Sequence, residues 1–304
     1  MWVIEEDESG RQMVKALILT DGQPYTKRYV ETLIAEGHEV YVQVAPGVTQ
    51  TTTGISQTID LFDLADVQQA MAQMDFVAII GEPIRSYTAL TQANEHDRAQ
   101  LVYENIAVAL QQSNVAQVLV IQAKPSSILM ETFNAYGISV SYEKRQTTRW
   151  QRGKHVLAHV AQDVHSVRSI QSLNIPKGIT MEGALSLYGR FLKTLHGRLV
   201  NGVYDGEYFT IVLKPFNIPL IKMQHAKHSE RTTGVIMDIT GGLLVGASAR
   251  QPRFEIRRLG KDTTQCMIGL HDFVPSMPWG MYRLIQAPLH VAVSHMFRKY
   301  WEKF

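Results

Sequence analysis

The chain has 304 residues, 45% of them hydrophobic, which is enough apolar material to fill two cores, and we therefore expect two domains. Its 30 basic and 28 acidic residues nearly cancel to a net charge of +2, without a long run of like charge, which argues against nucleic acid as a partner. The single cysteine, Cys266, excludes an intramolecular disulfide and favours a reducing, cytoplasmic location, and no apolar stretch reaches the roughly 18 residues of a stable membrane span.

The first half alternates strand and helix patterns. Residues 1–12 are acidic and fit no signal peptide, so we expect a disordered leader, with folded structure from Met13. A first helix is expected after the turn at Asp21-Gly22 and ends at Gly37. Further helices are expected at 67–74 and 101–110. Short apolar strands are expected at 14–19, 40–44, 58–61, 76–80 and 118–121. This alternation predicts an α/β fold over residues 13–150, a Rossmann-like doubly wound parallel sheet with helices on both faces.

Three motifs in this half have a recognisable spacing. They are LIAEGHEVYV at 33–42, DLFD at 60–63, and Asn105 ten residues before Val115. Together they resemble the extended and atypical short-chain dehydrogenase/reductase superfamily, in particular its NmrA-like branch, over residues 14–145. The resemblance implies an NAD(P)-binding fold, with NAD(P) as the candidate cofactor.

The phosphate-binding turn of that family is altered in this chain. The three glycine positions of its GxxGxxG motif fall on Thr20, Gln23 and Thr26, and only Gly22 remains nearby. Side chains at these positions obstruct the usual approach of a diphosphate to the helix N-terminus, although two hydroxyl groups and the helix dipole remain. The candidate cofactor-binding residues are Thr20, Gly22, Gln23, Thr26, Asp60 and Leu61, of which Asp60 could equally be a turn or helix-capping residue.

The catalytic residues of the family are also missing. Gln122-Ala123 stands where the family usually has serines, and Tyr142 is followed four residues later by Gln146 instead of lysine. Ala45-Pro46 can neither hold a ribose nor bind a 2′-phosphate. Because the proton-donating Tyr-Lys pair is absent, catalytic residues stay unknown and enzymatic activity stays an open question.

The second half has a different pattern. We expect a strand at 167–173 and a helix at 181–195, and a long helix closes the chain near 285–301. Between the helices, five antiparallel strands are expected at 208–214, 220–224, 232–239, 254–258 and 265–270. This order predicts an α+β domain with an antiparallel sheet over residues 151–304.

Two segments of this half, RFEIRR at 253–258 and DFVPSMPWGMYRLIQAPLHVAVSHMF at 272–297, are similar to helix-grip modules found behind NmrA-like domains in bacteria. The resemblance implies a helix-grip (START/polyketide-cyclase-like) fold with an apolar pocket. The expected pocket residues are His271, Trp279, Tyr282 and His290, with Tyr208, Phe254, Met267, Phe273, Leu289 and Met296 as further lining candidates or ordinary core residues.

Several histidines are considered as metal ligands or acid–base groups. His225 and His228 have metal-ligand spacing but no obvious acidic third ligand nearby. His155 and His159 would face the same way only on a helix, and the residues between them fit a strand equally well, so no metal site is predicted. If the second pocket were catalytic, His271, Asp272 and His290 would be the acid–base candidates.

The leading hypothesis is a non-catalytic protein that senses or binds a nucleotide or another small molecule. One alternative is an atypical NAD(P)-dependent oxidoreductase or epimerase with an altered cofactor loop. A second alternative is a hydrophobic-ligand binding protein that acts through its C-terminal domain. Ligand identity, oligomeric state and pathway do not follow from the sequence.

Overall fold

The computed structural model describes residues 13–22, 24–49, 53–145, 159–160, 165–175, 178–195, 199–226, 234–260 and 264–303. The chain divides into two compact units, one of residues 1–87 and 102–161 and the other of residues 88–101 and 162–304. This division differs from a boundary at residue 150, because residues 88–101 belong with the second unit. The expected leader at 1–12 lies outside the described residues. In the described part of the chain, no helix combines the length and hydropathy needed to cross a membrane.

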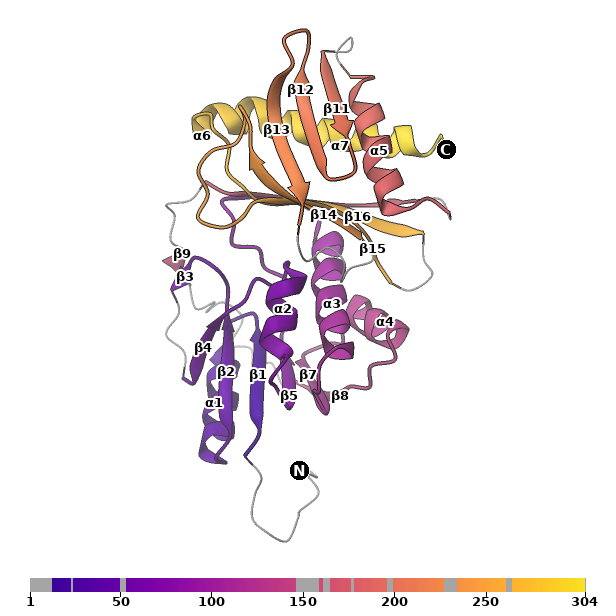
Figure 1. The fold of residues 1–304 in the computed structure, drawn as a ribbon. Helices are drawn as coiled ribbons and strands as arrows, with labels where there is room; N and C mark the ends of the chain where they lie inside the picture. Colours follow the sequence, from indigo (N-terminus) through magenta and orange to yellow (C-terminus); the bar gives the residue numbers. More distant parts are fainter. Residues whose placement is uncertain are drawn as a thin grey trace. The chain divides into compact units, whose positions relative to one another are not determined.

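The first unit contains a parallel sheet (Figure 1). Its strands are β1 (Lys15–Thr20), β2 (Glu39–Val44), β4 (Ile55–Thr58), β5 (Phe76–Ile80), β7 (Gln117–Gln122) and β8 (Ser141–Lys144). They lie in the order β4-β2-β1-β5-β7-β8, and every neighbouring pair is parallel. This is the strand order of the doubly wound Rossmann fold, so the fold expected for this half is confirmed. Two short strands, β3 (Val48–Thr49) and β9 (His159–Val160), form a separate ladder.

Helices follow the strands as the crossover connections of a parallel sheet. They are α1 (Pro24–Ala35), α2 (Leu64–Met71), α3 (Glu95–Gln111) and α4 (Ser127–Ala135), and residues 95–101 of α3 are counted with the second unit. Val30 and Leu33 of α1 pack against Ala16 and Ile18 on one sheet face. Because strand side chains alternate, the equally buried Leu17 faces the other side, so the sheet is apolar on both faces.

Three expected elements of the first half have wrong bounds, and one of them is the helix expected at 101–110, which is α3 and begins at Glu95. The strand expected at 58–61 is β4 at Ile55–Thr58, and the expected helix at 67–74 is α2, which begins at Leu64. The cause is Asp63, whose side chain accepts a hydrogen bond from the Ala65 amide and caps the helix. The chain must turn before this cap, which ends the strand early.

The second unit contains a mostly antiparallel sheet in the order β11-β12-β13-β14-β15-β16-β10-β6, whose last pair alone is parallel. The strands are β6 (Leu90–Gln92), β10 (Val167–Asn174), β11 (Val200–Tyr204), β12 (Tyr208–Leu213), β13 (Ile218–His225), β14 (Gly234–Gly241), β15 (Arg253–Arg258) and β16 (Gln265–Phe273). The helices are α5 (Met181–Leu192), α6 (Trp279–Met281), the π-helix η4 (Tyr282–Gln286) and α7 (Ala287–Trp301). This confirms the expected α+β class and adds two strands, β6 and β11, that the sequence did not predict.

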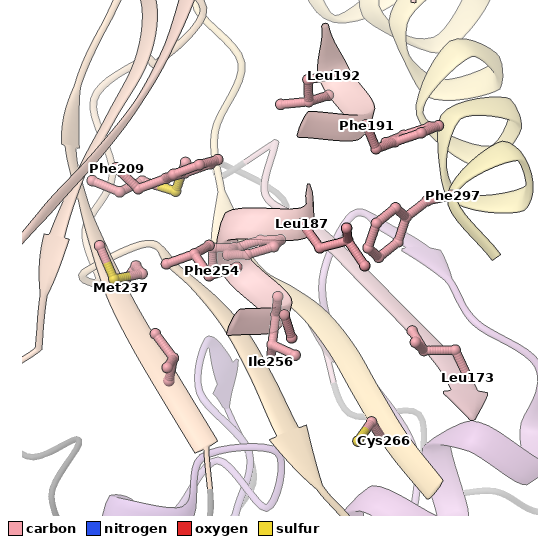
Figure 2. Close-up of a cluster of buried hydrophobic side chains, with 14 of the residues drawn as sticks. Leu173, Leu187, Phe191, Leu192, Phe209, Met237, Phe254, Ile256, Cys266 and Phe297 are labelled. Atoms are coloured by element: carbon pink, nitrogen blue, oxygen red, sulfur yellow. The ribbon is translucent and has the colours of Figure 1, made fainter. Parts of the chain in front are cut away.

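The core of the second unit lies between this sheet and the helices α5 and α7. Phe254 on β15 and Phe209 on β12 face Phe191 of α5 and Phe297 of α7 (Figure 2). Burial of side chains of this size stabilises a fold by about 1.5–3 kcal/mol each. Pro288 lies in the first turn of α7 and follows η4 directly, within a continuous helical run from Trp279 to Trp301.

Candidate functional sites

The order of the parallel sheet reverses between β1 and β5. In doubly wound folds, ligands bind in the crevice outside the carboxyl ends of the two strands at this switch point. Here β1 is followed by Asp21 and β5 by Gly81, which has a φ of 76°. A methyl group placed on Gly81 would overlap the Asp21 carboxyl group, so that group lies directly against the Gly81 backbone. A carboxylate at this point disfavours a diphosphate, which is also negatively charged.

The altered phosphate turn uses its polar groups internally. The hydroxyl groups of Thr20 and Thr26 share a hydrogen bond of 2.6 Å, and both residues are buried. The Gly22 amide donates to the Thr20 hydroxyl at 3.0 Å. The structure therefore brings three candidate cofactor residues together, but their polar groups contact one another. Gln23 lies outside the described residues.

The carboxyl end of β7 is also occupied by internal hydrogen bonds. The Gln122 side chain donates to the Gly81 carbonyl at 2.7 Å and accepts from the Ser126 amide at 3.1 Å. Tyr142 donates its hydroxyl to the Gln122 carbonyl at 2.8 Å. These contacts connect β5, β7, β8 and the start of α4. The residue at the family's serine position thus has a structural role that the sequence alone did not reveal.

Tyr103 on α3 is the buried tyrosine of this region. Burial raises its pKa, and the negative charges of Glu82 and Asp21 raise it further. Its hydroxyl therefore keeps its proton at neutral pH. The reductase tyrosine acts as a proton donor only when a nearby cation facilitates loss of the proton, and Tyr103 has carboxyl groups nearby instead.

Asp60 and Leu61 form a turn between β4 and α2. The Asp60 side chain is buried and accepts a hydrogen bond of 3.1 Å from the Phe62 amide. The Leu61 carbonyl accepts one of 2.9 Å from the Asn105 side chain. These contacts give Asp60 the turn role that the sequence analysis offered as its alternative. Whether Asp60 and Leu61 also contact a nucleotide stays a prediction.

The second unit contains an apolar cavity of about 180 Å³. Its walls come from the core face of the sheet, from Tyr188 on α5 and from η4. The lining residues are Tyr188, Val200, Ile211, Leu220, Ile221, Met223, Ile239, Leu244, Phe254, Leu270, Phe273, Tyr282 and Gln286. Burial raises the pKa of both Tyr188 and Tyr282 to about 12, so these hydroxyl groups are neutral. The cavity is thus an uncharged space with a few polar atoms.

Of the four expected pocket residues, Tyr282 lines the cavity. The Trp279 ring stacks on the Tyr282 ring, with centroids 5.6 Å apart and planes 10° apart, and it also stacks on His165. His271 lies elsewhere, and the position of the His290 side chain is outside the described set. Of the further lining candidates, Phe254 and Phe273 line the cavity, Met267 is buried outside its lining, and Tyr208, Leu289 and Met296 are exposed.

His271 belongs to a charged network on the opposite face of the sheet. Its neighbour Leu270 lines the cavity, and successive strand side chains point to opposite faces. The His271 Nε2 atom lies 2.9 Å from a Glu255 carboxylate oxygen, and both side chains are buried. Next to them, the Asp272 carboxylate lies 3.5 Å from Arg168 and 3.4 Å from Arg250.

The charges of this network explain its protonation states. Burial lowers the pKa of His271, and the nearby Arg253 lowers it further, so the ring is neutral at pH 7 and Nε2 donates to Glu255. Burial alone would raise the pKa of Glu255, but His271, Arg257 and Arg253 lower it to about 2. A neutral histidine held by a carboxylate resembles an acid–base pair, but both side chains are buried.

Each of the two histidine pairs considered for a metal lies partly outside the described residues. The His225 ring is hydrogen-bonded to the Tyr204 hydroxyl at 2.8 Å, and His155 and His228 lie outside the described residues. Among the residues that the structure describes, no group of three His, Cys, Asp or Glu side chains could hold a metal ion.

No family model matches the chain. It is 25% identical over 294 residues to the auxiliary protein GraX of Staphylococcus aureus, covering 94% of this chain and 92% of GraX. A nucleoside-diphosphate-sugar epimerase from Staphylococcus aureus is similar at 15% identity and a TM-score of 0.31, over 43% of this chain and 49% of the epimerase. The allergen structure Ara h 8.0201 is similar at 9% identity and a TM-score of 0.32, over 46% of this chain and 99% of that structure. The chain thus spans about half the length of the epimerase, and its doubly wound fold is established by its own strand order.

Proposed function

We propose that this chain is a non-catalytic small-molecule binding protein whose ligand occupies the cavity of the second unit. The observation that carries the proposal is the uncharged cavity of about 180 Å³ between the sheet and η4. Apolar cavities in proteins are few and bind apolar ligands, because water gains little inside them. The antiparallel sheet with a long final helix supports a helix-grip type of domain, as the sequence suggested.

The size and lining of the cavity limit the class of ligand. A cavity of roughly 150 Å³ lined by apolar side chains accepts a benzene molecule. The cavity here is of similar size and is lined mainly by aliphatic and aromatic residues, with Gln286 and the hydroxyl groups of Tyr188 and Tyr282 as polar atoms. A small neutral ligand with one aromatic ring or a short alkyl group, and one hydrogen-bonding atom, fits this environment.

The first unit supports a non-catalytic role. Its switch point contains the Asp21 carboxyl group against Gly81 and the hydrogen-bonded pair Thr20–Thr26. A nicotinamide cofactor would have to displace these contacts and approach a carboxylate with its own negative charges. We therefore regard NAD(P) as the weaker candidate ligand and an oxidoreductase or epimerase as the alternative function. The name of GraX as an auxiliary protein is in keeping with a supporting role.

A thermal-shift titration tests the proposal. The full chain is titrated with indole, benzyl alcohol, NADH and NADPH, because a ligand that binds only the folded state raises the melting temperature by mass action. We expect a saturable rise with indole or benzyl alcohol and none with the dinucleotides. A saturable rise with a dinucleotide alone would contradict the proposal and support the alternative.

Two substitutions on β11 connect the binding to the cavity. Val200 lines the cavity and Val203 on the same strand is exposed, so Val200→Phe fills the space and Val203→Phe is its matched control. We expect Val200→Phe to weaken binding of the aromatic ligand at least about tenfold, since a phenyl ring occupies the ligand volume. Val203→Phe should bind like the unsubstituted protein. Equal binding by both variants would place the ligand elsewhere.

A further inference from the structure

The outer side of the helical run from the end of α6 through η4 to α7 carries exposed apolar side chains. Leu284 is 82% exposed, Ile285 59%, Met281 52%, Leu289 44% and Met296 40%. We call these five residues the η4–α7 face. Single exposed apolar residues are normal on protein surfaces, but five on one short segment form a patch of the kind that binds a partner.

The spacing of the five residues places them on one side of the helical segment. Successive members are separated by three, one, four and seven positions, as expected for neighbouring turns of a helix. The opposite side of the same segment is buried in the core through Tyr282, Phe297 and Trp301. A helix that is apolar on two sides needs a nonaqueous environment on both. The core provides this environment for one side only.

The charge of the segment indicates the kind of partner. Residues 273–301 contain no aspartate or glutamate. Lys299 lies three positions after Met296 on α7, Lys303 follows the end of α7, and Arg283 lies in η4 next to Leu284 in the sequence. All three basic residues are exposed, and Glu302 is the acidic residue next to them. A surface with apolar groups beside unbalanced positive charge is complementary to a negatively charged apolar surface.

A second copy of the chain would be a poorer match for this face. In a two-fold pair each residue of the patch meets the same patch on the other copy. Such a pair would bring Arg283, Lys299 and Lys303 close to their counterparts with only Glu302 to balance them. An anionic bilayer provides both the counter-charges and the apolar layer beneath them.

We propose that the η4–α7 face docks on the surface of an anionic lipid bilayer. Met281, Leu284, Ile285 and Leu289 enter the interface between head groups and acyl chains, and the basic residues contact the head groups. The helix lies on the membrane in the way of an interfacial amphipathic helix. This docking is independent of any ligand in the cavity, although Tyr282 and Gln286 of η4 also line that cavity.

Vesicle binding by the full chain tests the proposal. The protein is mixed with vesicles of phosphatidylcholine alone or of phosphatidylcholine with an equal share of phosphatidylglycerol, and the bound fraction is measured by flotation. We expect binding to the anionic vesicles that weakens as salt is added, because part of the attraction is electrostatic. Equal binding to both kinds of vesicle, or none to either, would overturn the proposal.

Substitutions assign the binding to the face. The double variant Leu284→Asn with Ile285→Asn should bind anionic vesicles at least about tenfold more weakly, because two apolar side chains no longer enter the bilayer. Lys299→Gln should weaken binding about fivefold. The matched control is Ile34→Asn, at an exposed isoleucine of α1 in the first unit, which should bind like the unsubstituted protein.

Two results from these variants would contradict the proposal. One is vesicle binding by the double variant equal to that of the Ile34→Asn control. The other is a concentration-dependent dimer in sedimentation velocity that the double variant abolishes, combined with no vesicle binding by the unsubstituted protein. That second result would assign the face to another copy of the chain. The substituted side chains are exposed, so the melting temperatures of all variants should stay close together.

Discussion

The two units of this protein treat their candidate ligand sites in opposite ways. The first unit has the strand order of a nucleotide-binding fold, but polar groups of its own chain meet at the switch point: Asp21 against Gly81, Thr20 with Thr26, and Gln122 with Ser126. The second unit keeps its polar network on one face of the sheet and leaves an apolar cavity on the other. The better-known ligand-binding fold is therefore the one with the poorer site.

This contrast shows why function cannot be transferred with the fold. A doubly wound sheet binds a dinucleotide because glycines leave room and free amides at one turn. Here the Gly22 amide is taken by the Thr20 hydroxyl, although the sheet around the turn is intact. The sheet depends on buried apolar strands, and it persists when the chemistry of a single turn changes.

The largest effect is expected for the polar network of the second unit. Glu255→Gln removes a buried carboxylate that accepts the His271 Nε2 hydrogen bond and whose ionised form Arg257 and Arg253 stabilise. Loss of one partner from a buried ion pair typically costs about 3–5 kcal/mol. We expect a loss of this size in the free energy of unfolding, measured by urea denaturation with tryptophan fluorescence.

The control for this variant is Glu131→Gln, at an exposed glutamate of α4, which should change the stability by less than about 0.5 kcal/mol. If Glu255→Gln were as stable as this control, the pair would not be structural. The His271–Glu255 pair would then become a candidate for chemistry, and the contrast between the two faces of the sheet would fail.

The pH dependence of the free energy of unfolding tests the same structural role of the His271–Glu255 pair. Burial alone would raise the pKa of Glu255, but His271 and two arginines lower it from 4.5 to about 2. Its contribution is therefore complete above about pH 4.5 and is lost as the pH falls toward 2, by roughly 3 kcal/mol in total. The pKa of His271 is lowered from 6.5, mainly by burial, so only the unfolded chain takes up that proton just below pH 6.5, and this also destabilises the fold as the pH falls.

Urea denaturation at pH 7, 5 and 3 measures this dependence. The unsubstituted protein should lose stability over the whole interval. Glu255→Gln should show a smaller loss between pH 5 and 3 than the unsubstituted protein, because it lacks the carboxyl group that titrates there. Parallel curves for the two proteins would mean that other carboxyl groups account for the acid sensitivity.

The accuracy of the sequence predictions followed the burial of each element. The strand β5 was predicted with its observed bounds because all five residues, FVAII, are apolar and buried. The strand β8 has the sequence SYEK with four exposed residues, so it carries no apolar pattern and was missed. Local patterns report burial, and an exposed edge strand is specified by its neighbour in the sheet instead.

The candidate sites were harder to predict because they depend on which way a side chain points. Leu270 lines the cavity while His271, the next residue, belongs to the charged network on the other face. The strand β16 is buried on both faces, so its sequence does not alternate clearly, and a shift of one position exchanges the two roles. The acidic residue directly after β1 was visible in the sequence, but its contact with Gly81 joins residues 60 positions apart.

The smallest effect is expected at the closed turn of the first unit. Thr26→Val keeps the shape of the side chain but removes its hydrogen bond to Thr20, which should cost about 1 kcal/mol in stability. The control is Thr32→Val on the same helix, where the hydroxyl group is exposed and donates a hydrogen bond to the Arg28 carbonyl.

NADPH should still produce no thermal shift with Thr26→Val, because Asp21 continues to occupy the switch point. A shift that appeared only in this variant would show that one hydroxyl pair, and not the carboxylate, keeps the dinucleotide out, and the first unit would then be a nucleotide site one substitution away from use.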